Sequence, residues 1–346
     1  MGQQGFWDFE TRHQKLETKK ELLICLDEMI PWDEFRPLLE SVYAKPRKSK
    51  AGRPPIDVIV MFKLLILQQL YTISDDELEY QVNDRLSFMR FLHLGLDEAV
   101  PDAKTVWLFR ERLRKAELVE SLFEQFGAYL NATGYQAQCG QIVDATLVPV
   151  PKQRNSRDDN SKVKAGQVPE DWQAKPHKLS QKDVDARWTK KNGTAHYGYK
   201  NHINRDAGHG FIRRYTVTDA SVHDSQVLGH LLDVDNTDDE IWADSAYLSI
   251  AIVTVLEMMG FESHINERAY RNRPLSKEQI ANNRERSKTR AKVEHVFGAM
   301  VNEMGGKAIR TIGLARAKAM LGLKNLTYNL KRYVFWQKQD IAAANA

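Results

Sequence analysis

Apolar residues recur at helical spacing through most of the first 130 residues. The run from Ile56 to Leu70 has helical length and a broad apolar surface. Residues three and four apart share a helix face, so this pattern predicts amphipathic helices. Ser74 and Glu77 match a capping box at the start of one of them. We therefore expect an all-α N-terminal region, either a helix-turn-helix-like DNA-binding arrangement or a bundle without DNA contact.

The pattern changes at Gly134, where short apolar runs replace the helical period. Strands are predicted at 142–150, 194–204, 210–218, 240–243 and 261–265. Helices are predicted at 225–232, 250–259, 282–304 and 314–336. Strands that alternate with helices favour parallel pairing through crossover helices. This half is therefore predicted to be an α/β domain, with a mixed sheet flanked by helices.

Two polar stretches interrupt these elements. Residues 45–55 are rich in proline and basic residues, which is typical of an exposed linker. Residues 152–193 form a polar insert, and loops of that length usually carry function or are disordered. We expect an N-terminal helical segment (1–45), a helical, DNA-binding or bundle domain (46–132), an α/β domain (133–338) and a tail (339–346).

Charge is distributed unevenly along the 346 residues, although the net charge is only +4. Residues 221–262 contain 9 Asp/Glu and no Lys/Arg, whereas residues 267–338 contain 17 Lys/Arg against 5 Asp/Glu. Clustered positive charge is typical of nucleic-acid binding, and solvated basic faces are the simpler alternative. No apolar run has the length of a membrane span, and no signal-peptide pattern is seen. Cys25 and Cys139 lack metal-type spacing, which indicates a reducing, cytoplasmic location.

Three carboxylates stand in unusual surroundings. Asp144 lies within an apolar strand, Asp244 lies at the carboxyl end of another, and Glu294 lies on a basic helix. A carboxylate in an apolar run is costly unless something neutralises it. If these groups converge, they form an oxygen-rich site for a hard divalent cation. Each also has a simpler interpretation: Asp144 as a hydrogen-bonded strand residue, Asp244 as a helix cap, and Glu294 as the ion-pair partner of Arg290.

Many short motifs, in order along most of the chain, match one protein family. The chain resembles the bacterial insertion-sequence transposases with a DDE triad, in the broad insertion sequence four/five assemblage. The matching segments are Gly52-Arg53-Pro54-Pro55, 64–70, 74–79, Asp84-Arg85, 101–105, Phe109-Arg110, 143–146, 185–188, 196–200, 220–225, 243–247 and 290–294.

The resemblance implies a ribonuclease H-like catalytic domain that uses Mg²⁺ or Mn²⁺, with Asp144, Asp244 and Glu294 as catalytic and metal-binding residues. The implied reaction is hydrolytic cleavage at the transposon ends, followed by attack of the freed 3′-hydroxyl on target DNA. Related transposases carry a Tyr-x2-Arg-x3-Glu-x6-Lys signature. Here Ser287 and Val301 replace its tyrosine and lysine.

Several further residues are candidates for DNA contact or support. Arg290 either orients Glu294 or binds a phosphate, and Lys292 or Lys307 is a candidate phosphate contact. Lys200 follows two tyrosines, a pattern that suits DNA contact or strand packing. The remaining candidates are Arg53 in the linker, His223-Asp224 as a helix cap or an acid-base pair, and Trp172 and Trp188 as packing anchors or base-stacking residues.

The leading hypothesis is an active DNA transposase that binds terminal inverted repeats and target DNA, as a homodimer on DNA, without membrane association. The alternatives are a nuclease of the same fold that does not join strands, and a DNA-binding regulator without chemistry. Three carboxylates near phosphates would repel DNA in the absence of metal, which argues against the regulator. The expected location is the bacterial cytoplasm, at the nucleoid.

Overall fold

The computed structural model describes residues 21–43, 56–191 and 193–345. Packing divides the chain into two compact units. A helical unit comprises Met1–Gln69, Ile73–Leu118 and Thr327–Ala346, and an α/β unit comprises Leu70–Thr72 and Val119–Leu326. The expected linker, with Arg53, lies outside the described residues. Compared with the predicted boundaries, helix α8 (Leu118–Ala132) groups almost entirely with the sheet, and the end of α16 (Leu314–Ala344) groups with the helices.

The helical unit confirms the all-α prediction for the N-terminal region. Its helix α4 is buried on nearly every side, which explains why the run from Ile56 to Leu70 lacks a polar face. Among the described residues, no single helix is long and apolar enough to cross a membrane, and only α4 and α5 taken together, across a 103° bend, meet the requirement. The helices are α2 (Leu22–Met29), α3 (Arg36–Glu40), α4 (Val58–Tyr71), α5 (Asp75–Asp84), α6 (Leu86–Leu92) and α7 (Ala103–Lys115).

A half-buried polar junction joins three of the N-terminal motif residues. Arg110 on α7 donates to both carboxylate oxygens of Asp75 at 2.7 and 2.8 Å, and to Gln68 at 2.7 Å. These bonds outweigh desolvation and hold the pKa of Asp75 below its usual value. Ser74 caps α5 by accepting from the Glu77 amide, as predicted. These motif residues therefore have a structural role in joining α4, α5 and α7.

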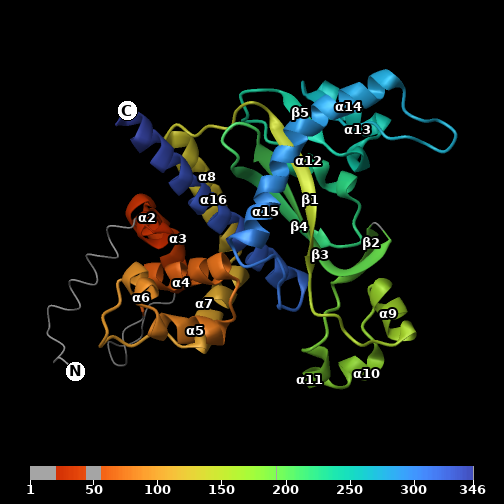
Figure 1. Ribbon diagram of the computed structural model, residues 1–346. Helices are drawn as coiled ribbons and strands as arrows, with labels where there is room; N and C mark the ends of the chain where they lie inside the picture. Colours follow the sequence, from red (N-terminus) through yellow and green to blue (C-terminus); the bar gives the residue numbers. More distant parts are fainter. Residues whose placement is uncertain (1–20, 44–55, 192, 346) are drawn as a thin grey trace, which may run out of the picture. The chain divides into compact units, whose positions relative to one another are not determined.

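The α/β unit has one six-stranded mixed sheet (Figure 1). Neighbouring strands follow the order β2-β3-β1-β5-β6, and β4 also pairs with β3. Strands β3 and β4 pair antiparallel in the meander from β1, whereas β1, β5 and β6 are parallel. This is the ribonuclease H-like arrangement that the resemblance implied. The strands are β1 (Gln141–Pro149), β2 (Arg187–Lys191), β3 (Thr194–Asp206), β4 (Ile212–Asp219), β5 (Glu240–Ala243) and β6 (Glu262–Ile265).

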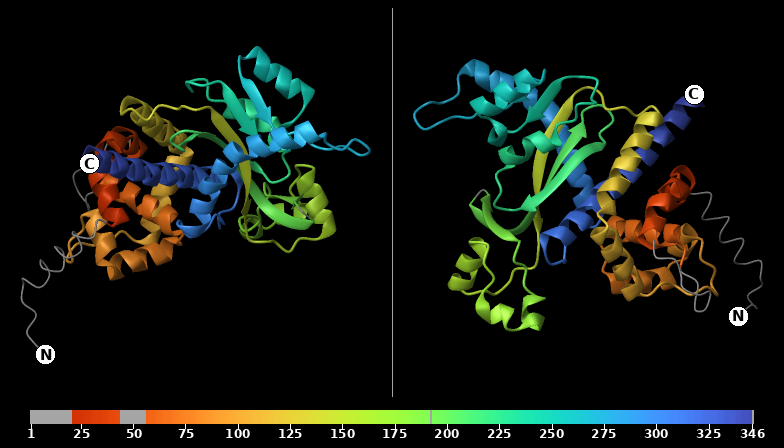
Figure 2. Two further views of the ribbon diagram at one scale, coloured as in Figure 1. Left: turned by 45° about the horizontal axis from the view of Figure 1, so that its top comes forward. Right: turned by 180° about the vertical axis from the view of Figure 1, so that it is seen from behind.

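Helices cover both faces of the sheet, as the two views of Figure 2 show. Alternate residues of β1 point to opposite faces. Val143 packs in a core with α12 (Leu228–Leu231) and α13 (Ile250–Met258). Val148 packs on the other face with Ala317 and Leu321 of α16. Asp144 and Thr146 share the face of Val148, so helices that follow β6 in the sequence cover the predicted catalytic face.

The polar insert is more ordered than the sequence suggested. It contains three short helices, α9 (Arg157–Lys164), α10 (Glu170–Gln173) and α11 (Pro176–Leu179), followed by β2. Trp172 is fully buried, which confirms it as a packing anchor, whereas Trp188 on β2 is 45% exposed and packs against Tyr197. Strand β2 was not predicted, because Arg187-Trp188-Thr189-Lys190-Lys191 carries no apolar alternation.

Gly198 is the residue of β3 at which pairing with β2 ends and pairing with β1 begins, and β4 pairs from the next residue onward. It faces Arg187 on one side and Pro149 on the other, and its φ of +148° lies where side chains are disfavoured. A Cβ atom there would collide with the Val148 carbonyl. Only glycine therefore allows the β2–β3 hairpin to take this course.

We predict that Gly198→Ala lowers the free energy of unfolding by roughly 2–4 kcal/mol, because it adds backbone strain and a clash with a buried carbonyl. Urea denaturation followed by circular dichroism measures this change. The matched control is Gly127→Ala in α8, where a Cβ atom would meet nothing within 4 Å. A helical glycine replaced by alanine should gain about 0.5–1 kcal/mol. Equal effects of the two substitutions would contradict the assignment.

Candidate active site

Asp144 and Asp244 lie side by side at the centre of the sheet. Strands β1 and β5 are parallel, and Val143 is paired with Ala243. Each aspartate follows directly after these paired residues, so both occupy neighbouring positions on one face. The Asp244 carboxylate also accepts from the Ala246 amide at 2.8 Å, which caps a short 3-10 turn. The predicted cap is thus confirmed, and it fixes the orientation of Asp244.

The two carboxylates affect each other electrostatically. Burial, and to a smaller extent the negative charge of Asp244, raise the pKa of Asp144 to about 6 overall. Opposing influences come from the Ala145 amide, Arg290 and Lys191, which stabilise the charged form. The Asp144 side chain is 17% exposed. Asp144 is therefore a partly buried carboxylate next to a second carboxylate. A bound cation would stabilise its charged form.

Arg290 occupies the space between Asp144 and Glu294. Its guanidinium lies 3.3 Å from the Asp144 carboxylate and 3.6 Å from that of Glu294. Its Nε is buried and has no hydrogen-bond partner among the described residues. The Glu294 side chain is 67% exposed. Arg290 thus forms the ion pair with Glu294 that the sequence allowed, and it adds a second one to the first aspartate.

The donor set fits a hard divalent cation at the two aspartates. They are carboxylates, which such ions prefer, and their mutual repulsion gives an ion something to neutralise. Tyr247 adds a buried hydroxyl without a hydrogen-bond partner among the described residues. Burial and the charges of Asp224, Asp144 and Asp244 hold the pKa of this phenol well above its usual value. Glu294 does not complete a metal site with the two aspartates in this structure. Within the described residues, no three His, Cys, Asp or Glu side chains are placed to hold a metal ion.

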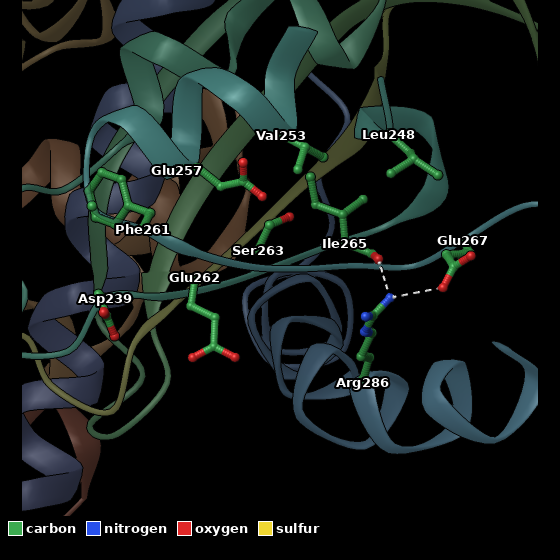
Figure 3. A pocket seen from close by; sticks show the side chains of 11 residues that line it. Asp239, Leu248, Val253, Glu257, Phe261, Glu262, Ser263, Ile265, Glu267 and Arg286 are labelled. Atoms are coloured by element: carbon green, nitrogen blue, oxygen red, sulfur yellow. Dashed lines mark hydrogen bonds and ion pairs between the residues drawn. The ribbon is translucent and has the colours of Figure 1, made fainter. Parts of the chain in front are cut away.

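The end of β6 fixes the helix that carries Arg290. Arg286 donates to the Ile265 carbonyl at 2.8 Å and lies 3.8 Å from the Glu267 carboxylate (Figure 3). Ser287, at the signature tyrosine position, accepts from Asn266 at 3.1 Å. These bonds anchor α14 (Lys277–Arg290) to the sheet ahead of α15 (Glu294–Asn302). Ser287 therefore has a structural role here.

The pocket in Figure 3, about 560 Å³ in volume, is not the catalytic site. Its lining includes four carboxylates, from Asp239, Glu257, Glu262 and Glu267, and one guanidinium, from Arg286. It contains none of the three predicted catalytic residues. Its negative charge would repel DNA, so the pocket accounts for neither the predicted chemistry nor a DNA-binding surface.

The other candidate residues have varied surroundings. The Lys200 ammonium donates to the Val222 carbonyl at 2.7 Å and to Asp224 at 2.8 Å, so this lysine has an internal partner. The Lys292 ammonium approaches the Ala207 carbonyl at 3.4 Å, while the residue as a whole is exposed. His223 accepts from the Ser225 amide and caps a short turn, which confirms the favoured interpretation. Val301, at the signature lysine position, is 46% exposed.

Three features of the site had no clear signal in the sequence. Tyr247 was noted only as part of a motif, although its hydroxyl lies near the aspartates. Lys191 belongs to a strand that was not predicted. Lys307 was only one of two candidates for a phosphate contact, and the structure places its ammonium 2.7 Å from the Thr146 hydroxyl. These residues lie 42 to 158 positions after the end of β1, so the sequence gives no sign that they are its neighbours.

We predict that Asp144→Asn stabilises the metal-free protein by about 1–3 kcal/mol at pH 7.5, because it removes a desolvated charge. Because the pKa of Asp144 is raised in the folded state, the charged carboxylate lowers the free energy of unfolding at pH values above this pKa. The advantage of the variant should shrink as the pH falls through about 6 towards 4, where the wild-type carboxyl is protonated. Urea titrations in chelator at several pH values measure it. A constant difference between pH 7.5 and 4 would contradict this account.

Comparison with known proteins agrees with this geometry. A family model described as "Transposase DDE domain" matches residues 135–330, and one described as "Transposase domain (DUF772)" matches residues 10–112. Among solved structures, the cryo-EM structure of the piggyBac transposase synaptic complex with hairpin DNA is similar at 12% sequence identity and a TM-score of 0.46. The similarity covers 93% of this chain and 76% of that one. The first match spans more than half of the chain, including the strands and helices that carry Asp144, Asp244 and Glu294. The chain belongs to the DDE-domain transposases, enzymes that cut and join DNA.

Proposed function

We propose that this transposase cuts and joins DNA at the face of the sheet that carries Asp144 and Asp244, with Glu294 as the third member of the triad. One observation carries the proposal: two half-buried carboxylates lie on one face, on β1 and directly after β5, with their register fixed by the pairing of Val143 with Ala243. The ends of open α/β sheets where parallel strands terminate are the usual place for such sites.

Asp144 and Asp244 are the residues that would hold Mg²⁺ or Mn²⁺, as hard divalent ions suit carboxylate ligands. When bound, such ions activate an attacking oxygen and stabilise a leaving oxygen at a phosphodiester. The protein supplies the rigid placement of the two aspartates, through the β1–β5 pairing and the Ala246 cap.

Glu294 joins this set only if Arg290 shifts. In the structure, Arg290 neutralises Asp144 and holds Glu294 on its other side. A DNA phosphate is an anion for which a guanidinium has a strong preference, through paired hydrogen bonds. We therefore propose that DNA draws Arg290 away from Asp144 and leaves Glu294 free to approach the aspartates.

The partners follow from the chemistry of transposition. Transposon ends are paired before joining, so we propose a homodimer on DNA that binds terminal inverted repeats and target DNA, in the bacterial cytoplasm at the nucleoid. Lys292 has the exposure that a DNA contact needs. Lys200 has a partner in Asp224, which supports a structural role for it.

We predict that Asp144→Asn and Asp244→Asn each reduce cleavage at least about 1,000-fold, while DNA affinity stays within a few-fold of wild type. The substrate is a labelled duplex with the inverted repeat that flanks this gene, together with target DNA and Mg²⁺. The control is Asp171→Asn, an exposed carboxylate on α10 that pairs with Lys178, which should keep full activity.

The same assay separates the alternatives. Joined product with the wild-type protein supports transposition, cleavage without joining supports a nuclease, and binding alone supports a regulator. Cleavage that survives in Asp144→Asn at saturating Mg²⁺ would overturn the triad assignment.

A further inference from the structure

Thr146 lies two residues after Asp144 on β1, and so on the same face of the sheet. Two residues along a strand span roughly 7 Å, which is comparable with the separation of neighbouring phosphates on one DNA strand. The Thr146 side chain is nearly buried and accepts a hydrogen bond from the Lys307 ammonium at 2.7 Å. Because a hydroxyl both accepts and donates, Thr146 still has its own proton to offer to an anion.

The chain holds Lys307 in this place from both sides. Before it, the Gly306 amide donates to the Met300 carbonyl at the end of α15, at 3.0 Å. After it, the Ile309 amide donates to the Pro149 carbonyl of β1 at 3.2 Å, and Ile309 is buried in the core beside Val148. Lys307 is therefore not a loose surface lysine. Its segment runs along the end of β1 and directs its ammonium at the catalytic face.

A second lysine comes to the same place from the β2–β3 hairpin. Lys191 is the last residue of β2 and pairs with Thr194 at the start of β3. The hairpin turns between these two residues, and Gly198, where a side chain would collide with β1, lies four residues further along β3. The positive charge of Lys191 favours the charged form of Asp144 and disfavours the charged form of Lys307. Burial and this second positive charge lower the pKa of Lys307.

The positive charges of these two lysines are not neutralised by ion pairs. Neither lysine forms an ion pair with a carboxylate of the described residues. The charge of Lys191 acts on Asp144, and Lys307 donates to Thr146 on the same strand. Two like charges held together, one of them half-buried, cost free energy unless an anion binds between them. Lysine ammonium groups and a hydroxyl donor are typical ligands of a phosphate.

We propose that Lys307, Thr146 and Lys191 form a subsite for a DNA phosphate next to the one that is cut. This proposal rests on the proposed function, because it assumes that the scissile phosphate lies at Asp144 and Asp244. A phosphate bound at this subsite fixes the position of the DNA strand along β1. The neighbouring phosphate, which is the one that is cut, then lies at Asp144 and Asp244. The three residues are positioning residues, since they contact the strand one step from the reacting atoms.

The test measures how DNA affinity depends on salt, without divalent metal, for a duplex with the inverted repeat that flanks this gene. Each phosphate contact contributes about 0.9 to the slope of log affinity against log salt concentration. Lys307→Met and Lys191→Met should each lower the slope by about 0.9, and Lys307→Arg should keep it. The control is Lys162→Met on α9, whose ammonium pairs with Asp158 and whose slope should match wild type.

A second measurement locates the phosphate. One phosphate beside the cleavage position is replaced by an uncharged methylphosphonate, and the affinity of each variant is measured again. Lys307→Met should then bind this duplex as tightly as wild type does, while it still binds the fully charged duplex more weakly. An unchanged slope in both lysine variants, or an equal loss in Lys162→Met, would overturn the subsite.

The outcomes for the two proposals can be told apart. Lys191 is exposed, so Lys191→Met should fold even if Lys307→Met does not, and circular dichroism checks both. A wild-type protein that binds but never cuts would refute the proposed chemistry and leave the salt measurement valid. A wild-type protein that cuts, with unchanged salt slopes in both variants, would refute the subsite alone.

Discussion

The parallel pairing of β1 with β5 is the constraint on which the site depends. It brings together two aspartates that are 100 residues apart in the sequence and places them on one face of the sheet. That face is partly closed by the helices that follow β6, so the carboxylates are desolvated and repel each other. Protein interiors hold such pairs only where something offsets the cost. In the structure Arg290 offsets part of it, and a divalent ion is the other candidate.

The positive groups around the aspartates follow from the same electrostatic requirement. Arg290 approaches from α14, Lys191 from the β2–β3 hairpin, and Lys307 from the segment after α15, three parts of the α/β unit that are distant in sequence. Arg290 and Lys307 contact side chains of β1, and the charge of Lys191 acts on Asp144; of these three, only Arg290 forms an ion pair with a carboxylate of the described residues. The result is a site with negative charge at its centre and positive charge around it, which suits a cation and a phosphate backbone together.

Much of this fold could be predicted from the sequence, because its main strands are apolar runs bounded by polar turns. The β1, β3, β4, β5 and β6 strands and the helices between them lie close to where the periodicity placed them. The aspartates could be predicted as neighbours for the same reason, since Asp144 and Asp244 both belong to such runs. Strand β2 could not be, because its residues are mostly charged and gain their structure from pairing with β3.

The surroundings of the site were harder to predict, because they depend on tertiary contacts that leave no periodic signal. Arg290 and Glu294 are one helical turn apart, so their ion pair was foreseeable. The contact of Arg290 with Asp144 was not, because it depends on how α14 is anchored to the end of β6. For Lys200 the sequence suggested a contact that the structure does not favour. Its sequence context suits DNA contact, but its ammonium donates to Asp224, 24 residues away.

The central claim is that Asp144 contacts a divalent metal during catalysis, and a change of metal specificity tests it most directly. Asp144→Cys replaces an oxygen ligand by sulfur, which binds Mn²⁺ better than Mg²⁺. We predict that this variant does not cleave transposon-end DNA in Mg²⁺ and regains measurable cleavage in Mn²⁺. A variant that cleaves equally well with either ion, at the wild-type rate, would contradict the account.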